Sequence, residues 1–134
     1  MPDVNSTSIN LTGIYVTDNG FAAYKALTPI RAVTVEEAPE DLDEVLNGIA
    51  EVHISFASPA DGRGFSTARC LRDRGYQGRV IAVGGLVCDQ YRHARQSGFD
   101  GVLISQEQAA KMPERHWLEQ ANRVAVNYRA QIYA

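Results

Sequence analysis

The residues best suited to bind a ligand lie in one short loop, Asp61-Gly62-Arg63-Gly64-Phe65-Ser66. The loop follows a strand-like apolar run, 52–56, and precedes a run with helical spacing, 67–74. Glycines let backbone N–H groups converge, and the N-terminus of the next helix adds partial positive charge. With the Arg63 guanidinium and the Ser66 hydroxyl as donors, these residues predict a site for phosphate, sulfate or sulfite.

The same loop also has a purely architectural interpretation. Glycine-rich turns occur wherever the backbone needs their geometry, and Asp61 could simply pair with Arg63. Asp61 is more typical of a helix N-cap than of a catalytic base, because short polar side chains favour that position. The residues alone leave both interpretations open.

A second glycine loop, Gly84-Gly85, follows the next predicted strand. Its spacing differs from G-x-G-x-x-G, so it does not predict a dinucleotide site. Neighbouring parallel strands lie about 5 Å apart, and we therefore expect the two loops to line one crevice. The candidate ligand-binding residues are Asp61, Gly62, Arg63, Gly64, Ser66, Gly84, Gly85, Asp89 and Gln90.

Thiol and imidazole chemistry has weaker support. Cys88 falls in the first turn of a predicted helix, where the helix dipole lowers a thiol pKa. A redox role is therefore one interpretation and a small half-buried thiol is the other. His53 lies inside a predicted strand, and no histidine or cysteine spacing matches a metal site. We expect no metal, and no cofactor is evident.

Composition is that of one ordinary domain: 134 residues, 45% hydrophobic and 22% charged. The net charge of −3 gives no field that attracts nucleic acid. No apolar run approaches the roughly 18 residues of a membrane span, and two cysteines make no disulfide framework. The polar residues 1–10 lack a signal pattern, so we expect a flexible leader on a cytoplasmic protein.

The elements predict an α/β fold in which a mainly parallel sheet is flanked by helices in three layers. An N-terminal hairpin is expected from Ile14–Thr17 and Phe21–Leu27, joined at Asn19-Gly20. The alternative is a partial (β/α) barrel completed by dimerisation. The remaining predicted strands are 31–35, 52–56, 79–83 and 101–104, and the predicted helices are 39–48, 65–74 and 87–97.

The C-terminal region predicts a long amphipathic helix. Ser105 and Gln108 have capping-box spacing, and an apolar stripe then continues beyond Pro113. We expect this stripe to pack on the sheet or on another subunit. Its members are Trp117, Ala121, Val124, Tyr128 and Ile132.

The stretch from Phe56 to Asp100 resembles an uncharacterised bacterial family, domain of unknown function 934. The residues that carry the resemblance are Asp61-Gly62-Arg63-Gly64-Phe65-Ser66, Ala68-Arg69, Leu71-Arg72, Gly75-Tyr76, Gly78, Ala82-Val83-Gly84, Asp89-Gln90 and Gly98-Phe99-Asp100, with a weaker echo at Tyr128 and Gln131. The chain departs from the family pattern at Cys88, where a cation is often found.

Members of that family are often labelled oxidoreductases and tend to be encoded beside assimilatory sulfite reductase. The resemblance therefore implies an accessory role near sulfite or sulfate reduction, with a sulfite reductase subunit as partner, and supplies no catalytic residue. The second hypothesis is a small anion- or nucleotide-binding oxidoreductase or sensor that uses the loops 61–66 and 84–90. Self-association into a homo-oligomer is a further expectation.

Overall fold

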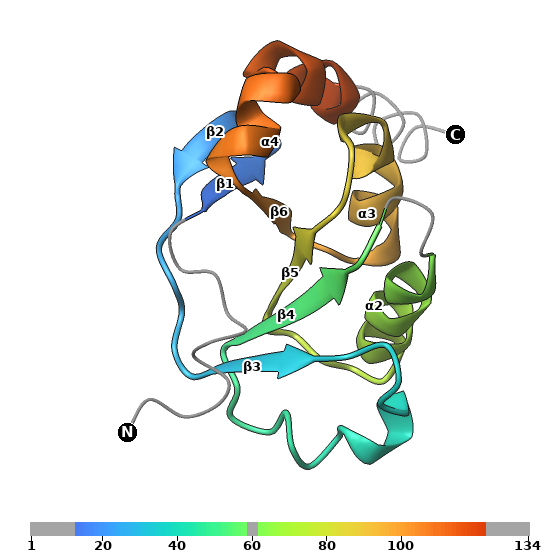
Figure 1. The fold of residues 1–134 in the computed structure, drawn as a ribbon. Coiled ribbons are helices and arrows are strands. Elements are labelled where there is room, and N and C mark those ends of the chain that lie inside the picture. The colour runs from blue at the N-terminus through green and yellow to red at the C-terminus, as the bar shows by residue number, and fades with distance from the viewer. Residues whose placement is uncertain (1–12, 59–61, 123–134) are drawn as a thin grey trace, which may run out of the picture.

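An open six-stranded sheet forms the centre of the computed structural model, which describes residues 13–58 and 62–122 (Figure 1). The strands lie in the order β2-β1-β6-β5-β4-β3. Four of them run parallel: β3 (Ile30–Val33), β4 (Glu51–Phe56), β5 (Arg79–Gly84) and β6 (Gly101–Ile104). The sheet confirms the predicted α/β fold, and because it has two edges it is not a closed barrel.

The N-terminal hairpin extends this sheet at the β6 side. β1 (Ile14–Thr17) pairs antiparallel with β6 and with β2 (Gly20–Ala23). The return strand therefore ends at Ala23 rather than at the predicted Leu27. The chain leaves the sheet at Tyr24, because that side chain turns to buried polar groups on β4. Residues 24–29 then cross to β3 at the opposite edge (Figure 1).

The helices lie over one face of the sheet. α2 (Arg63–Asp73) joins β4 to β5, and the short η2 (Cys88–Gln90) with α3 (Tyr91–Ser97) joins β5 to β6. Right-handed crossovers between strands added in one direction must place both helices on the same face. That face holds the main core, which includes Ile54, Leu71, Val80, Ala94 and Val102.

The opposite face of the sheet carries a smaller apolar cluster. Tyr15, Ile81 and Leu103 form it, and Tyr24 packs against it from the crossing segment. A second helical layer, as expected for a three-layer arrangement, is not formed by the described residues. The chain order explains this difference, because the three described crossovers between parallel strands all advance in one direction, from β3 towards β6.

The predicted helix over residues 39–48 is wrong. The structure has the short η1 (Pro39–Asp41) followed by turns up to Gly48. Leu42 and Leu46 are buried as their spacing suggested. The segment is short, and its closely spaced carboxylates repel one another, so a continuous helix would gain little.

The C-terminal part begins with α4 (Gln106–Lys111), where the predicted capping box is confirmed. The Ser105 hydroxyl accepts from Gln108 N at 3.1 Å, and Gln108 Oε1 accepts from Ser105 N at 2.9 Å. Residues 114–122 are helical and bury Trp117 in the main core. Val124, Tyr128 and Ile132 lie outside the described residues, as does the predicted leader. No described helix has the length and apolar character needed to cross a membrane.

Candidate functional site

The two glycine loops meet at the carboxyl ends of β4 and β5. Phe56 pairs with Gly84 in the parallel ladder, and Gly85 N donates to Phe56 O at 2.9 Å. Gly84 has a φ of +104°, and a Cβ on Gly85 would lie 3.0 Å from Ser58 Cα. Both positions therefore require glycine because the backbones of the loops approach each other closely.

The backbone amides of the second loop are largely engaged within the chain. Leu86 N donates to Gly84 O at 2.9 Å, Val87 N to Gln90 Oε1 at 3.1 Å, and Cys88 N to Met112 Sδ at 3.4 Å. On the carbonyl side, Gln108 Nε2 donates to Gly84 O at 2.7 Å. The loop is thus folded onto α4, and these N–H groups do not point into a shared anion site.

The first loop is described from Gly62 onwards, and Asp61 lies outside the described residues. Gly62 is the N-cap residue of α2 and makes no side-chain cap hydrogen bond. The cap position is therefore Gly62, one residue after the predicted Asp61. Arg63 is exposed, and its Nη1 lies 3.6 Å from Glu36 Oε1. Ser66 is also exposed.

Gly64 has an architectural role. It is buried, and a Cβ at this position would lie 2.4–2.9 Å from ring atoms of Phe56. A side chain would push α2 away from β4. The second glycine of the Asp61–Ser66 motif is therefore explained by packing of the helix on the strand.

Cys88, Asp89 and Gln90 form η2, the short helix that follows the second glycine loop. Asp89 is exposed and Gln90 caps the turn through Val87 N. The Cys88 thiol lies 3.9 Å from Asp89 Oδ1. Burial raises the pKa of the Cys88 thiol, and the neighbouring carboxylate raises it further. The environment thus favours the protonated thiol, contrary to the activation expected from the helix dipole.

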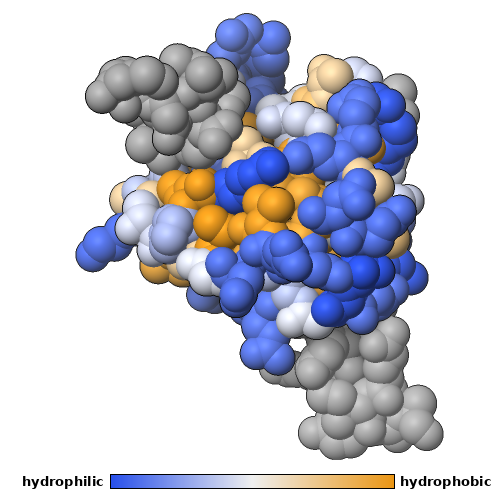
Figure 2. Space-filling view, turned by 90° about the horizontal axis from the view of Figure 1, so that it is seen from below, coloured by the Kyte–Doolittle hydropathy of each residue, from blue (hydrophilic) through white to orange (hydrophobic). Residues whose placement is uncertain are grey.

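The structure also has two hollows at the amino ends of β4 and β5, away from the glycine loops. One is lined by Leu46, Ile49, Arg74 and Tyr76 among others. The other is lined partly by Leu27, Arg72, Arg79 and Asp100. Seen from below, the molecule has an apolar patch surrounded by hydrophilic side chains (Figure 2).

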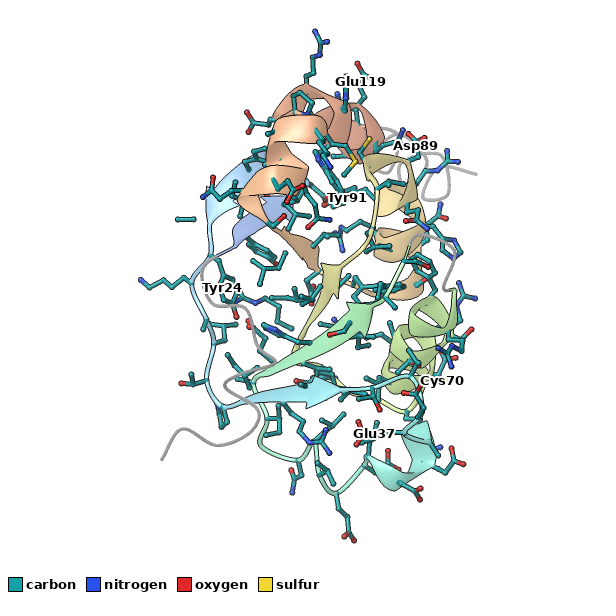
Figure 3. The ribbon with its side chains drawn as sticks, in the orientation of Figure 1. Tyr24, Glu37, Cys70, Asp89, Tyr91 and Glu119 are labelled. Carbon is teal, nitrogen blue, oxygen red and sulfur yellow. The ribbon has the colours of Figure 1, made fainter. Side chains whose placement is uncertain are left out.

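A buried polar cluster lies beside the second hollow, on the sheet face that carries none of the described helices. Glu51 is 0% exposed and His53 is 2% exposed. Glu51 Oε2 accepts from the Tyr24 hydroxyl and lies 2.6 Å from His53 Nε2, while Glu51 Oε1 accepts from Arg79 Nε at 2.5 Å. Tyr24 belongs to the crossing segment, on the side of the sheet opposite Cys70 and Asp89 (Figure 3).

Arg79 completes the cluster. Its guanidinium lies 5.2 Å from the Tyr15 ring centroid and 5.8 Å from that of Tyr24, and its Nη2 donates to Lys25 O at 2.6 Å. Positive charge beside two aromatic rings is favourable. The guanidinium therefore holds the crossing segment against the sheet while it neutralises Glu51.

The charge states in the cluster follow from these contacts. Burial alone would raise the pKa of Glu51, but hydrogen bonds from three neighbouring side chains outweigh it, and the pKa lies below its ordinary value. Burial, and then the bond to Glu51, raise the pKa of Tyr24. An ionised carboxylate only accepts hydrogen bonds, so His53 donates through Nε2. His53 Nδ1 is buried without a hydrogen-bond partner in the described structure.

The sequence carries a signal for this cluster in the alternation of polar and apolar residues along β4. Glu51, His53 and Ser55 are polar residues at alternate positions of β4, between apolar ones, so they share one face. A carboxylate in a buried strand requires a partner. The partners come from distant parts of the chain, so only the fold identifies them.

The fold and these contacts define a single-domain α/β protein with an open, mainly parallel sheet and with helices on one face. The model of the family described as "Bacterial protein of unknown function (DUF934)" matches residues 32–134. The chain therefore belongs to this family. No curated protein matches the chain.

Proposed function

We propose that this protein is an accessory protein of assimilatory sulfur reduction in the cytoplasm, which acts by binding a sulfite reductase subunit. Membership of the family supports the proposal, because its members tend to be encoded beside assimilatory sulfite reductase. The structural observation that carries the binding role is the engagement of the second loop. The backbone N–H groups of residues 85–88 donate hydrogen bonds within the chain. This favours a scaffold role for the loop over a site that binds and activates a ligand.

The surroundings of Cys88, the possible redox residue, and of Arg63, a candidate ligand-binding residue, support the same proposal. Cys88 lies beside a carboxylate, and the pKa of its thiol is raised by burial, then by that carboxylate. Arg63 is exposed to solvent at the start of α2. Nucleophilic catalysis requires an activated nucleophile, whereas burial and the Asp89 carboxylate both favour the protonated form of the Cys88 thiol.

Growth of the native host tests the role. Deletion of the gene is expected to impair growth on sulfate or sulfite as the sole sulfur source and to spare growth on cysteine. Affinity purification of the tagged chain from that host should recover a sulfite reductase subunit. Normal growth on sulfate and sulfite, together with no co-purified subunit, would contradict the proposal.

The alternative is a small oxidoreductase or sensor for an anion or nucleotide at the two loops. One observation favours it: α2 begins at Gly62 with no side-chain cap and with no acidic residue in its first turn. Calorimetric titration with sulfite, sulfate, phosphate and NADPH tests this alternative. Binding of one of them that is weakened by Arg63→Ala would support it over the accessory role.

A further inference from the structure

At each edge of the sheet, side chains of the same molecule are hydrogen-bonded to outward backbone groups. At the β2 edge, Phe21 N donates to Glu114 Oε2 at 2.8 Å. Thr17 and Gly20 flank the two-residue turn as a hydrogen-bonded pair, so the next pair, Phe21 with Val16, is a non-hydrogen-bonded one. The Phe21 amide therefore points out of the sheet, where a further strand would pair.

The β3 edge is covered by a different pair of side chains. Pro29 O faces β4, because it accepts from two backbone amides of the segment that starts β4. By the alternation of a parallel ladder, Ala32 O and Thr34 N face outward. Arg31 Nη1 donates to Ala32 O, and Thr34 N donates to Glu37 Oε2 at 2.8 Å.

The two side chains at the β3 edge hold each other in place. Arg31 Nη2 lies 2.9 Å from Glu37 Oε1, and Arg31 Nη1 lies 3.3 Å from Glu37 Oε2. The hydrogen bond from Arg31, together with the other contacts, lowers the pKa of Glu37. The Arg31 guanidinium thus binds the outward carbonyl of Ala32 in β3, and the Glu37 carboxylate binds the outward amide of Thr34, the residue just after β3.

An open edge strand is a template for pairing with another chain, because its outward N–H and C=O groups are unpaired. Here both edge strands have only four residues, and an incoming strand must first displace charged groups from their hydrogen bonds. We propose that Glu114 and the Arg31–Glu37 pair close the two edges, so that neither a second copy nor a partner's strand adds to the sheet. This concerns the sheet itself and stands independently of the sulfur-assimilation role.

Removal of the carboxylates tests the proposal. The purified Glu114→Ala, Glu37→Ala and doubly substituted chains are compared with the parent by size-exclusion chromatography with light scattering over a range of concentrations. The matched controls are Glu119→Ala, on the same helix as Glu114, and Glu40→Ala, in η1; both residues are exposed. Circular dichroism reports whether each chain is folded.

The substituted chains should shift to a higher mass than the parent as concentration rises, and the controls should not. Adding Ala22→Lys to Glu114→Ala should reverse the shift, because Ala22 is an exposed β2 residue and lysine on an edge opposes pairing. If folded Glu114→Ala keeps the mass of the parent, the proposal is wrong for the β2 edge. If Glu37→Ala fails to fold, the folded Glu114→Ala chain decides the result alone. If the Glu114→Ala chain still shifts to a higher mass after Ala22→Lys is added, the chains do not pair through the β2 edge, and the proposal is wrong for that edge.

Discussion

Glu51 and His53 lie two residues apart on β4 and meet inside the protein, with Glu51 Oε2 2.6 Å from His53 Nε2. Alternation along the strand places both side chains on the face away from the helices. The pair joins the crossing segment, through Tyr24, to β5, through Arg79. The face without helices is therefore fixed by a polar cluster as well as by apolar packing.

Loss of the Glu51 charge should destabilise the fold strongly. In Glu51→Gln, Arg79 keeps a positive charge in a mostly buried position without its counter-ion. Breaking a buried ion pair from one side costs about 3–5 kcal/mol, and the lower end applies because Arg79 is 20% exposed. Urea denaturation measures this change. Glu40→Gln, at an exposed position, should stay within about 0.5 kcal/mol of the parent.

The same carboxylate should make stability depend on acid pH. Burial raises the pKa of Glu51, but its hydrogen bonds bring it below the ordinary value. Its contribution is therefore fully present above the unfolded-chain pKa of about 4.3 and is lost as pH falls through the folded pKa. Denaturation between pH 7 and pH 3 should show a smaller fall in stability for Glu51→Gln than for the parent. Equal slopes for the two chains would contradict this prediction.

Two glycines of the first loop should respond differently to alanine. A Cβ at Gly64 would lie within 2.4–2.9 Å of the Phe56 ring, so Gly64→Ala should cost about 1–3 kcal/mol of stability. Gly62→Ala is the matched control, because its Cβ would meet no atom within 4 Å. In Gly62→Ala, the lower entropy of the unfolded chain should stabilise the fold and the poorer N-cap should destabilise it. The two effects on the free energy of unfolding should cancel to within about 0.5 kcal/mol. Similar losses in both variants, by thermal or urea unfolding, would argue against the packing role.

The two cysteines should differ in reactivity. Cys70 is exposed on α2, whereas Cys88 is partly buried, and burial followed by the Asp89 carboxylate raises the pKa of its thiol. Because the thiolate is the reactive form, Cys88 in a Cys70→Ser chain should react slowly with a disulfide reagent near pH 8. Cys70 in a Cys88→Ser chain should react faster. Faster reaction at Cys88 would instead support the redox interpretation.

Sequence patterns predicted most of the sheet, because apolar periodicity reports burial directly. Strands 52–56, 79–83 and 101–104 emerge close to their observed bounds, and Ser105 with Gln108 marked the start of α4. The segment 39–48 shows the limit of this reasoning. Leu42 and Leu46 have helical spacing and are buried, yet they lie in turns.

The glycine loops illustrate the same limit at the candidate site. Parallel pairing of β4 with β5 correctly predicted that the loops meet. The sequence could not tell that the second loop is bonded to distant side chains of the same chain, because Met112 Sδ accepts from Cys88 N and Gln108 Nε2 donates to Gly84 O. Side chains distant in sequence therefore decide that the second loop is bonded within the chain instead of lining an anion site.

The sequence by itself determined that this chain is an α/β protein with glycine-bearing loops after two neighbouring strands, because local periodicity and turn chemistry are encoded within a few residues. Tertiary structure alone decided the role of Glu51. His53 lies two residues away on the same strand, but Tyr24 and Arg79 come from the crossing segment and from β5, and only the packed sheet brings these two within hydrogen-bonding distance of Glu51.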